Sequence, residues 1–302
     1  MTNEEKLKNI KLRDRVVRAM DKSGKFRISC VKNTKAVQTA VFRHHLPAIP
    51  SFITARLMSA ASMVASFQKG EERIVLEMES YNAISKVFCE AMTNGEVRAY
   101  ANYAPNIDEI VFDSIEDVFG AGLFRISKIL YDQPEPLVGL VPIMKGDVST
   151  DLAYYYRQSE QIPTAVILDV ASDDDGVITQ SGGMIVQALP GASEEDTEKV
   201  HEHLIRATAL TDLFDNEYTP DKVIRELLPF DVEIVGSTQV DFYCRCSKDQ
   251  FISKLITLGE NEIKGMKAEN HNELVCQYCN EKYLLDEADF DSIISHIVAK
   301  KN

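Results

Sequence analysis

The distribution of the cysteines is the feature that most constrains this chain. Of six cysteines in 302 residues, four form two close pairs near the C-terminal end, Cys244 with Cys246 and Cys276 with Cys279. A C-x-C or C-x-x-C pair places two thiolates on one tight turn, and two such turns complete the tetrahedral four-sulfur shell that zinc accepts. The sequence therefore predicts one zinc ion held by these four residues, in a structural site without an open position for water.

The remaining cysteines and one histidine receive simpler interpretations. Cys30 and Cys89 stand alone in apolar runs, and we expect them to be small buried core residues. His271 is an alternative ligand, but its separation from Cys276 is not a usual metal-binding turn and four sulfurs already suffice. The other alternative is that the paired cysteines are surface thiols or permanent disulfides.

The start of the chain and its composition bear on that alternative. Residues 1–6 are polar and acidic, without a basic patch followed by an apolar run, so we expect no secretory signal and a cytoplasmic protein. In a reducing cytosol, paired cysteines more often hold metal or perform redox chemistry than form permanent disulfides. The uncharged stretch at 57–68 runs only about a dozen residues and still contains Ser and Gln, so we expect no transmembrane helix.

The charge of the chain limits its partners. Lys and Arg total 33 against 47 Asp and Glu, which gives a net charge of −14. Such a charge repels nucleic-acid backbones and anionic membrane surfaces, so neither is an expected partner. The 45% of hydrophobic residues are enough for a buried core, and the chain length favours two domains.

The N-terminal part predicts an α/β core of the α+β type, with a mixed sheet and packing helices. Residues 72–79 alternate between apolar and polar side chains, which predicts a strand whose Ile74, Leu76 and Met78 point inward. Apolar residues at three- and four-residue steps predict a packing helix over 50–67. We expect further strands at residues 25–31, 97–102, 123–127, 137–144, 164–170 and 184–189, and a helix at 148–160.

An acidic segment follows this core. Residues 193–233 carry twelve acids and four bases, which is −8 of the total −14. A capping pattern at Ser193 predicts one short helix, and Pro220 predicts the start of another. Short helices with self-repelling charges are marginal in water, so their order should depend on docking against a neighbour. The alternative is an ordinary solvated connector.

The C-terminal part of the chain contains few apolar positions for its length. Ser247 begins a predicted helix with an apolar face of Phe251, Leu255 and Leu258, which Gly259 ends, and a second helix begins near Glu287. A core this thin rarely stands on hydrophobic burial alone, so we expect the metal to be required for folding. We therefore divide the chain into an α/β core domain at 1–191, an acidic helical linker at 192–241 and a four-cysteine zinc module at 242–302.

Sequence signals for catalysis are missing. The chain has no Walker-type phosphate loop, no dinucleotide-binding glycine motif, no nucleophile elbow and no H-E-x-x-H zinc motif. The His44-His45 pair is interpreted as a helix end, and the His201-x-His203 pair as part of a solvated acidic face. We therefore expect no catalytic residues, no cofactor other than zinc, and no enzyme activity.

Several stretches together resemble a known family. They are Cys244-Arg245-Cys246-Ser247, Cys276-Gln277-Tyr278-Cys279 with Tyr283 after it, Gly146-Asp147 leading into Asp151-Leu152-Ala153-Tyr154-Tyr155, Gln158-Ser159-Glu160-Gln161-Ile162-Pro163-Thr164, and Gly183-Met184-Ile185-Val186-Gln187-Ala188-Leu189-Pro190-Gly191. On these residues the chain resembles the redox-regulated 33 kDa chaperonins, a heat-shock holdase family. The resemblance spans nearly the whole chain.

The resemblance implies a function as well as a fold. In that family the four cysteines bind zinc when reduced and form two disulfides when oxidised, and all four positions are present here. The chain is then expected to be an ATP-independent chaperone that binds unfolded or partly folded client proteins and prevents their aggregation during oxidative stress. Disulfide formation and zinc release at the module would activate it, and a homodimer is expected for the oxidised form.

Two other classes of function remain as alternatives. A constitutive adaptor or nucleic-acid-binding protein with a static zinc ribbon would need a basic face. The region from Arg245 to Cys276 instead carries five bases against five acids. A zinc hydrolase would need an open coordination position, which four sulfur ligands do not leave.

Overall fold

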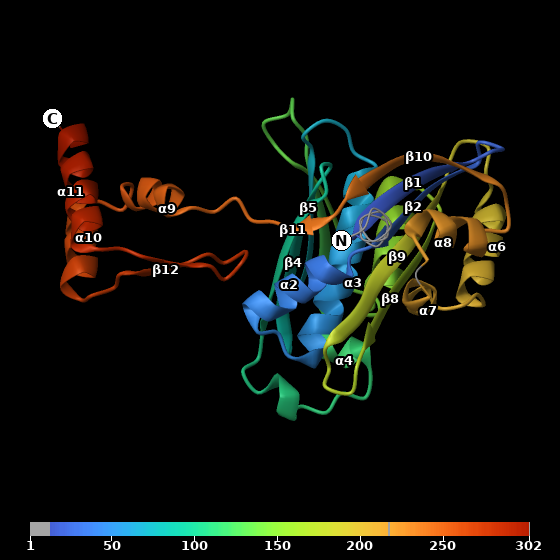
Figure 1. Cartoon of the computed structure of the whole chain (residues 1–302), viewed down its shortest axis with the longest axis horizontal. Helices are drawn as coiled ribbons and strands as arrows, with labels where there is room; N and C mark the ends of the chain where they lie inside the picture. The colour runs from blue at the N-terminus through green and yellow to red at the C-terminus, as the bar shows by residue number, and fades with distance from the viewer. Residues whose placement is uncertain (1–12, 217, 302) are drawn as a thin grey trace, which may run out of the picture. The chain divides into compact units, whose positions relative to one another are not determined.

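The computed structural model describes residues 13–216 and 218–301, and the chain divides into two compact units (Figure 1). The first unit is Met1–Tyr243 and the second unit is Cys244–Asn302, so the boundary falls directly before the first paired cysteine. The acidic segment 193–233 lies in the first unit. The division of the chain into core, linker and module stays a prediction.

The first unit contains two β-sheets. The five-stranded sheet is antiparallel throughout, and its strands in spatial order are β10 (Val232–Gln239), β1 (Arg15–Asp21), β2 (Phe26–Lys32), β9 (Ile178–Ala188) and β8 (Thr164–Ser172). The six-stranded sheet has the order β11 (Asp241–Phe242), β5 (Glu96–Tyr103), β4 (Ile84–Met92), β3 (Arg73–Ser80), β6 (Gly122–Ile129) and β7 (Leu137–Pro142). It is mixed, because β11 pairs in parallel with β5 while the other pairs are antiparallel.

Helix α3 (Ala48–Ser66) packs against strands of both sheets and forms the centre of the first unit. By length and composition this helix could also cross a membrane. However, 78% of its apolar stretch is buried inside the protein, as is typical of a core helix. The uncharged runs of the sequence do not reveal this apolar length, because the single charge of Arg56 separates two of them. The remaining helices of the α+β core are α2 (Thr34–His44), η1 (Ile107–Glu109), α4 (Ile115–Phe119), α5 (Val148–Tyr155) and η2 (Tyr156–Glu160).

The predicted inward face of β3 is confirmed, since Ile74, Leu76 and Met78 have no exposed surface. No pattern in the sequence predicted β1, β4, β10, β11, η1 or α4, and of α2 only the end was predicted. Strand β1 lacks a clean alternation because side chains on both of its faces are largely buried, and a period of two appears only when one face meets water. The His44-His45 interpretation is confirmed, because α2 ends at His44 and His45 adopts a left-handed conformation with φ 50°.

The acidic segment forms three helices, α6 (Glu194–Ile205), α7 (Leu210–Asp215) and α8 (Pro220–Leu227), beside the five-stranded sheet (Figure 1). Their apolar side chains join the buried cluster of that sheet: Val200, Leu204, Leu210, Leu213, Phe214, Val223, Ile224, Leu227 and Leu228. Their carboxylates pair with bases of β1 and its neighbourhood, with Asp221 3.3 Å from Arg15 and Asp196 3.2 Å from Lys25. The sheet is thus a neighbour that orders these helices.

The second unit is small. It consists of α9 (Lys248–Leu255), α10 (Glu260–Ala268), β12 (Glu273–Val275), β13 (Lys282–Leu284) and α11 (Glu287–Lys301). Among its described residues the buried apolar cluster has five members, Ile263, Leu285, Phe290, Ile293 and Ile297. The predicted end of the first helix was wrong: α9 stops at Leu255, Leu258 is 54% exposed, and Gly259, with φ 99°, is the N-cap of α10.

Candidate metal centre

The structure brings the four paired cysteines together in the second unit. Their sulfur atoms all lie within 4.8 Å of one another. The shortest contacts join one cysteine of each pair, 3.7 Å between Cys244 Sγ and Cys276 Sγ and 3.4 Å between Cys246 Sγ and Cys279 Sγ. Within the described part of the chain, this is the group of His, Cys, Asp and Glu side chains whose ligand atoms are close enough to share a metal ion.

The spacing of these sulfur atoms fits a tetrahedral metal site. Zinc–thiolate bonds of about 2.3 Å in a regular tetrahedron separate the sulfur atoms by roughly 3.8 Å. The two measured contacts are within a few tenths of an ångström of that value. Four soft sulfur donors in this geometry are typical of zinc or of iron–sulfur chemistry. The residues present therefore fit a metal ion of that type.

The C-x-x-C pair is positioned by a tight turn between β12 and β13. The Cys276 N–H donates to the Glu281 carbonyl at 2.9 Å, and the Asn280 N–H donates to the Cys276 carbonyl at 2.8 Å. Asn280 adopts a left-handed conformation with φ 55°, which asparagine tolerates better than most residues. The strands pair in antiparallel register, with Leu274 opposite Tyr283. This hairpin directs both thiols to the same side of the turn.

The C-x-C pair lies in the segment between β11 and α9. Ser247, the next residue, caps α9 by accepting a hydrogen bond from the Gln250 N–H at 3.3 Å. Lys248 then pairs with Asp289 of α11 at 2.5 Å, which ties the start of α9 to the C-terminal helix. The position of Cys246 therefore depends on the packing of α9 and α11.

The surroundings of the two hairpin cysteines favour the protonated form of their thiols. Burial raises the pKa of the Cys276 thiol and of the Cys279 thiol, and hydrogen bonds to neighbouring cysteines act in the same direction on Cys279. Backbone N–H groups of Tyr278 and Glu281 oppose this effect by donating to the two sulfurs. A divalent cation stabilises thiolates strongly, so it would displace these protons on binding.

A phenol completes the surroundings of Cys246. The Tyr283 hydroxyl donates to the Cys246 carbonyl at 3.1 Å and lies 3.2 Å from Cys246 Sγ. The contact with the sulfur raises the pKa of the Tyr283 phenol. From the sequence, Tyr283 was identified only as part of the family resemblance. Its spacing of four residues after Cys279 was the available signal, but the contact with Cys246 spans 37 positions of the chain.

The two remaining cysteines and the alternative histidine ligand lie outside the sulfur cluster. Cys30 and Cys89 are fully buried in the first unit, and burial raises the pKa of each, so the expectation of small buried core residues is confirmed. The His271 side chain is 69% exposed and pairs with Glu269, outside the sulfur cluster.

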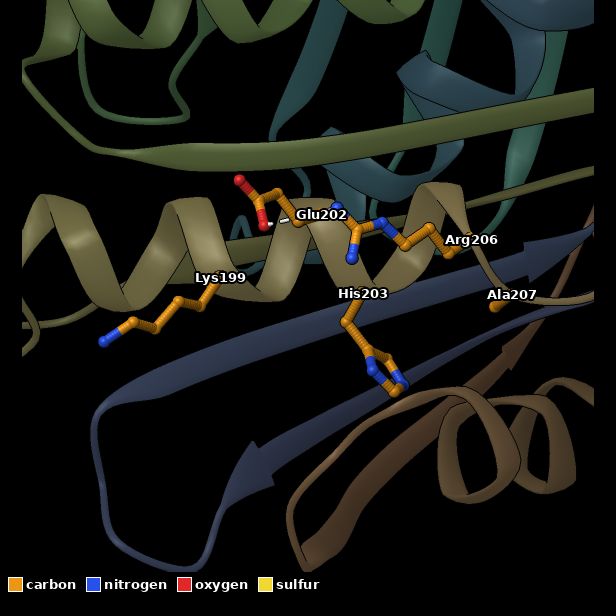
Figure 2. Close-up of a pocket in the computed structure, with 5 residues that line it drawn as sticks. All are labelled: Lys199, Glu202, His203, Arg206 and Ala207. Carbon is orange, nitrogen blue, oxygen red and sulfur yellow. Dashed lines mark ion pairs between the residues drawn. The ribbon is translucent and has the colours of Figure 1, made fainter.

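His203 lies at a shallow cavity of about 320 Å³ along α6, lined by Lys199, Glu202, His203, Arg206 and Ala207. In Figure 2, Glu202 and Arg206 form an ion pair while His203 points away from them. One histidine beside an ion pair does not make up a set of metal ligands.

Comparisons with known proteins cover nearly the whole chain. A model of the Hsp33 protein family matches residues 14–286. The 33 kDa chaperonin of Staphylococcus epidermidis is 30% identical over 287 residues, covering 93% of this chain and 98% of the relative. That of Streptococcus thermophilus is 29% identical over 293 residues, covering 93% and 99%. The crystal structure of the 33 kDa chaperonin of Thermotoga maritima superposes with a TM-score of 0.83 at 26% identity, covering 95% of this chain and 99% of that one.

Proposed function

The chain belongs to the Hsp33 family of 33 kDa chaperonins, and we propose that it is an ATP-independent holdase that oxidation switches on. Members of a chaperone family act on unfolded proteins, so clients rather than a small substrate are the partners. In the proposed inactive state, Cys244, Cys246, Cys276 and Cys279 hold one zinc ion. The observation that carries this proposal is the tetrahedral spacing of four sulfurs in a unit with a thin core.

The energetics favour zinc as the element that holds the second unit folded. Structural zinc bound by thiolates contributes about 10 to 16 kcal/mol at neutral pH, which equals or exceeds the stability of a small domain. Five buried apolar side chains form a small core for a unit that extends from Cys244 to Asn302. Loss of the metal is therefore expected to unfold this unit.

The proposed switch uses ordinary thiol chemistry. A cysteine thiolate attacks hydrogen peroxide, becomes a sulfenic acid and releases hydroxide. The partner thiolate then attacks the sulfenic sulfur, which forms the disulfide and releases a second hydroxide, so each disulfide consumes one peroxide. Two disulfides convert all four ligands into a form that no longer holds zinc. Disulfides within C-x-C and C-x-x-C close very small rings, so they constrain the unfolded chain little and do not replace the metal.

The second unit is connected along the chain to the acidic helices through β11 and β10. Cys244 follows Tyr243, whose N–H donates to the Val97 carbonyl beside the two-residue strand β11. Strand β10, just before it, lies at the edge of the five-stranded sheet and pairs only with β1 in the described structure. Edge strands with one partner open at lower free energy than central strands. We infer that unfolding of the second unit loosens β11, then β10, and then α8.

Such loosening would expose a surface suited to unfolded clients. Leu204, Val223, Leu227 and Leu228 are buried against the five-stranded sheet, and they become accessible when α6 and α8 detach. Binding through them would be hydrophobic and broad in specificity. The net charge of −14 would keep the resulting complexes soluble. A reducing cytoplasm as location and a homodimer of the oxidised form belong to the same proposal.

The decisive experiment measures aggregation of a chemically unfolded client without ATP. Reduced, zinc-loaded protein is expected to have little effect, whereas peroxide-treated protein suppresses aggregation as one zinc per chain is released. A Cys30→Ala/Cys89→Ala double variant is the matched control and should switch normally. Equal suppression by both forms would argue against the switch, and no suppression by either form would argue against the holdase.

A further inference from the structure

We propose that Tyr283 is a positioning residue of the four-sulfur centre, whose phenol donates a hydrogen bond to the Cys246 thiolate and thereby slows metal release and oxidation at that sulfur. This inference rests on the proposed zinc site. It adds to the four cysteines a fifth side chain that sets how readily the centre reacts.

The geometry of the phenol supports this role. Its oxygen lies 3.2 Å from Cys246 Sγ and 3.1 Å from the Cys246 carbonyl oxygen, so its single proton is within reach of both acceptors. A sulfur that binds a cation is a thiolate and has no proton to donate. In the metal-bound state the phenol is therefore the donor, and a hydrogen bond to an ionised acceptor is stronger than one to a neutral acceptor.

Cys276 and Cys279 on the hairpin accept hydrogen bonds from a different kind of donor than Cys246 does. Cys276 and Cys279 accept from the backbone N–H groups of Tyr278 and Glu281, which belong to the same turn. Cys246 instead receives a side-chain donor from β13, 37 positions away. Outer partners of metal ligands orient them and tune their reactivity, and loss of one typically costs about 10- to 100-fold in metal affinity.

The ring of Tyr283 is held independently of its hydroxyl. It lies 5.6 Å from the Phe251 ring on α9, at a tilt of 44°, and its residue pairs with Leu274 across the hairpin. Tyr283→Phe keeps these ring contacts and removes only the donor. Tyr243, a residue that is 53% exposed and directly precedes Cys244, provides a matched Tyr243→Phe control.

The first measurement is zinc affinity, by competition with a chromophoric chelator. Tyr283→Phe is expected to bind zinc about tenfold more weakly than the wild type, and Tyr243→Phe within twofold of it. The second measurement is site-resolved alkylation of the zinc-loaded proteins with iodoacetamide. In Tyr283→Phe, Cys246 should react several-fold faster while the rates at Cys244, Cys276 and Cys279 change little.

A purely structural role would accelerate all four cysteines together, and that result would overturn the proposal. Equal affinity and equal Cys246 rates in Tyr283→Phe and wild type would also overturn it and leave the proposed function intact. A wild-type chain that takes up no zinc would overturn both. If Tyr283→Phe fails to fold, the test is made on the wild type. Its Tyr283 hydroxyl proton should exchange slowly with water in the zinc-loaded protein. Fast exchange would contradict the proposed hydrogen bond.

Discussion

Helix α3 is buried along most of its length in the first unit, whereas the described second unit has a buried apolar cluster of only five side chains. Hydrophobic stabilisation grows with the apolar area removed from water, so the first unit has ample means to stay folded without a ligand. The second unit concentrates four sulfur atoms within 4.8 Å instead. A switch that works by unfolding is best located in the unit whose stability depends on chemistry that an oxidant can reverse.

Metal removal should produce the largest contrast between the units. Chelation of zinc from the reduced protein is expected to remove about 10 to 16 kcal/mol of binding free energy and to unfold residues 244–301. The two sheets of the first unit should keep their amide protection. Hydrogen exchange measures both effects in one experiment, and unchanged protection across residues 244–301 after complete zinc removal would contradict the proposal.

Stepwise oxidation should break the second unit in a defined order. Cys276 and Cys279 have the relaxed C-x-x-C spacing, while a Cys244–Cys246 disulfide closes a tighter ring, so we expect Cys276–Cys279 to form first. Zinc should leave at that step, because two thiolates hold it poorly. Mass mapping of partly oxidised protein gives the order. A species with Cys244–Cys246 bridged, the other pair reduced and zinc retained would disprove it.

A cavity in the first unit should leave the metal site unaffected. Leu57 of α3 is fully buried, and Leu57→Ala is expected to lower the free energy of unfolding by about 2 to 5 kcal/mol. The exposed Leu258 of the second unit is the control, and Leu258→Ala should change stability by less than about 0.5 kcal/mol. Urea unfolding and zinc content are measured together. A loss of zinc in Leu57→Ala would show that the units are coupled more tightly than we propose.

The pH dependence of the first unit should report Asp14. Burial raises the pKa of Asp14 from 3.8 to about 6, although the Ala36 N–H donates to it at 2.8 Å. The folded state thus binds the proton more tightly than the unfolded state, and Asp14 contributes stability at low pH that is lost as the pH rises from about 4 to 6. A shift from 3.8 to about 6 corresponds to about 3 kcal/mol.

Asp14→Asn should remove this contribution. The difference in unfolding free energy between wild type and variant is expected to change by roughly 2.4 kcal/mol between pH 4 and pH 7, with the wild type losing stability as the pH rises. Urea titrations across this range provide the measurement. Asp174→Asn, in an exposed turn, is the control, and parallel profiles for wild type and Asp14→Asn would contradict the assignment.

The smallest expected effect concerns the docking of the acidic helices. Arg15 of β1 pairs with Asp221 of α8, and a partly exposed pair of this kind contributes up to about 1 kcal/mol. Arg15→Ala should therefore speed amide exchange in α8 by up to about fivefold without changing zinc affinity. Lys22→Ala removes the more exposed pair with Asp231 and should have less effect. Equal exchange in α8 of all three proteins would show that burial alone docks the helix.

Much of the fold follows from local patterns. The alternation in β3, the three- and four-residue steps of α3 and the capping residues of α6 and α8 were readable because neighbours in sequence decide which side chains share a face. Strand β1, helix α2 and the end of α9 were missed or misplaced. In β1, side chains on both faces are largely buried, which removes the alternation on which a strand prediction depends, and in α9 no side chain is buried, so the apolar face expected to reach Leu258 does not form.

The candidate ligand set follows from the amino-acid sequence alone, because C-x-C and C-x-x-C spacing confines each pair of thiols to one turn. The need of the acidic segment for a neighbour follows in the same way, since short helices with like charges do not stand alone. Three facts come from tertiary packing instead: the five-stranded sheet is such a neighbour, the two cysteine pairs meet although they are far apart in the chain, and Tyr283 contacts Cys246. These contacts join distant positions, and their formation depends on how whole elements pack rather than on any pattern within one of them.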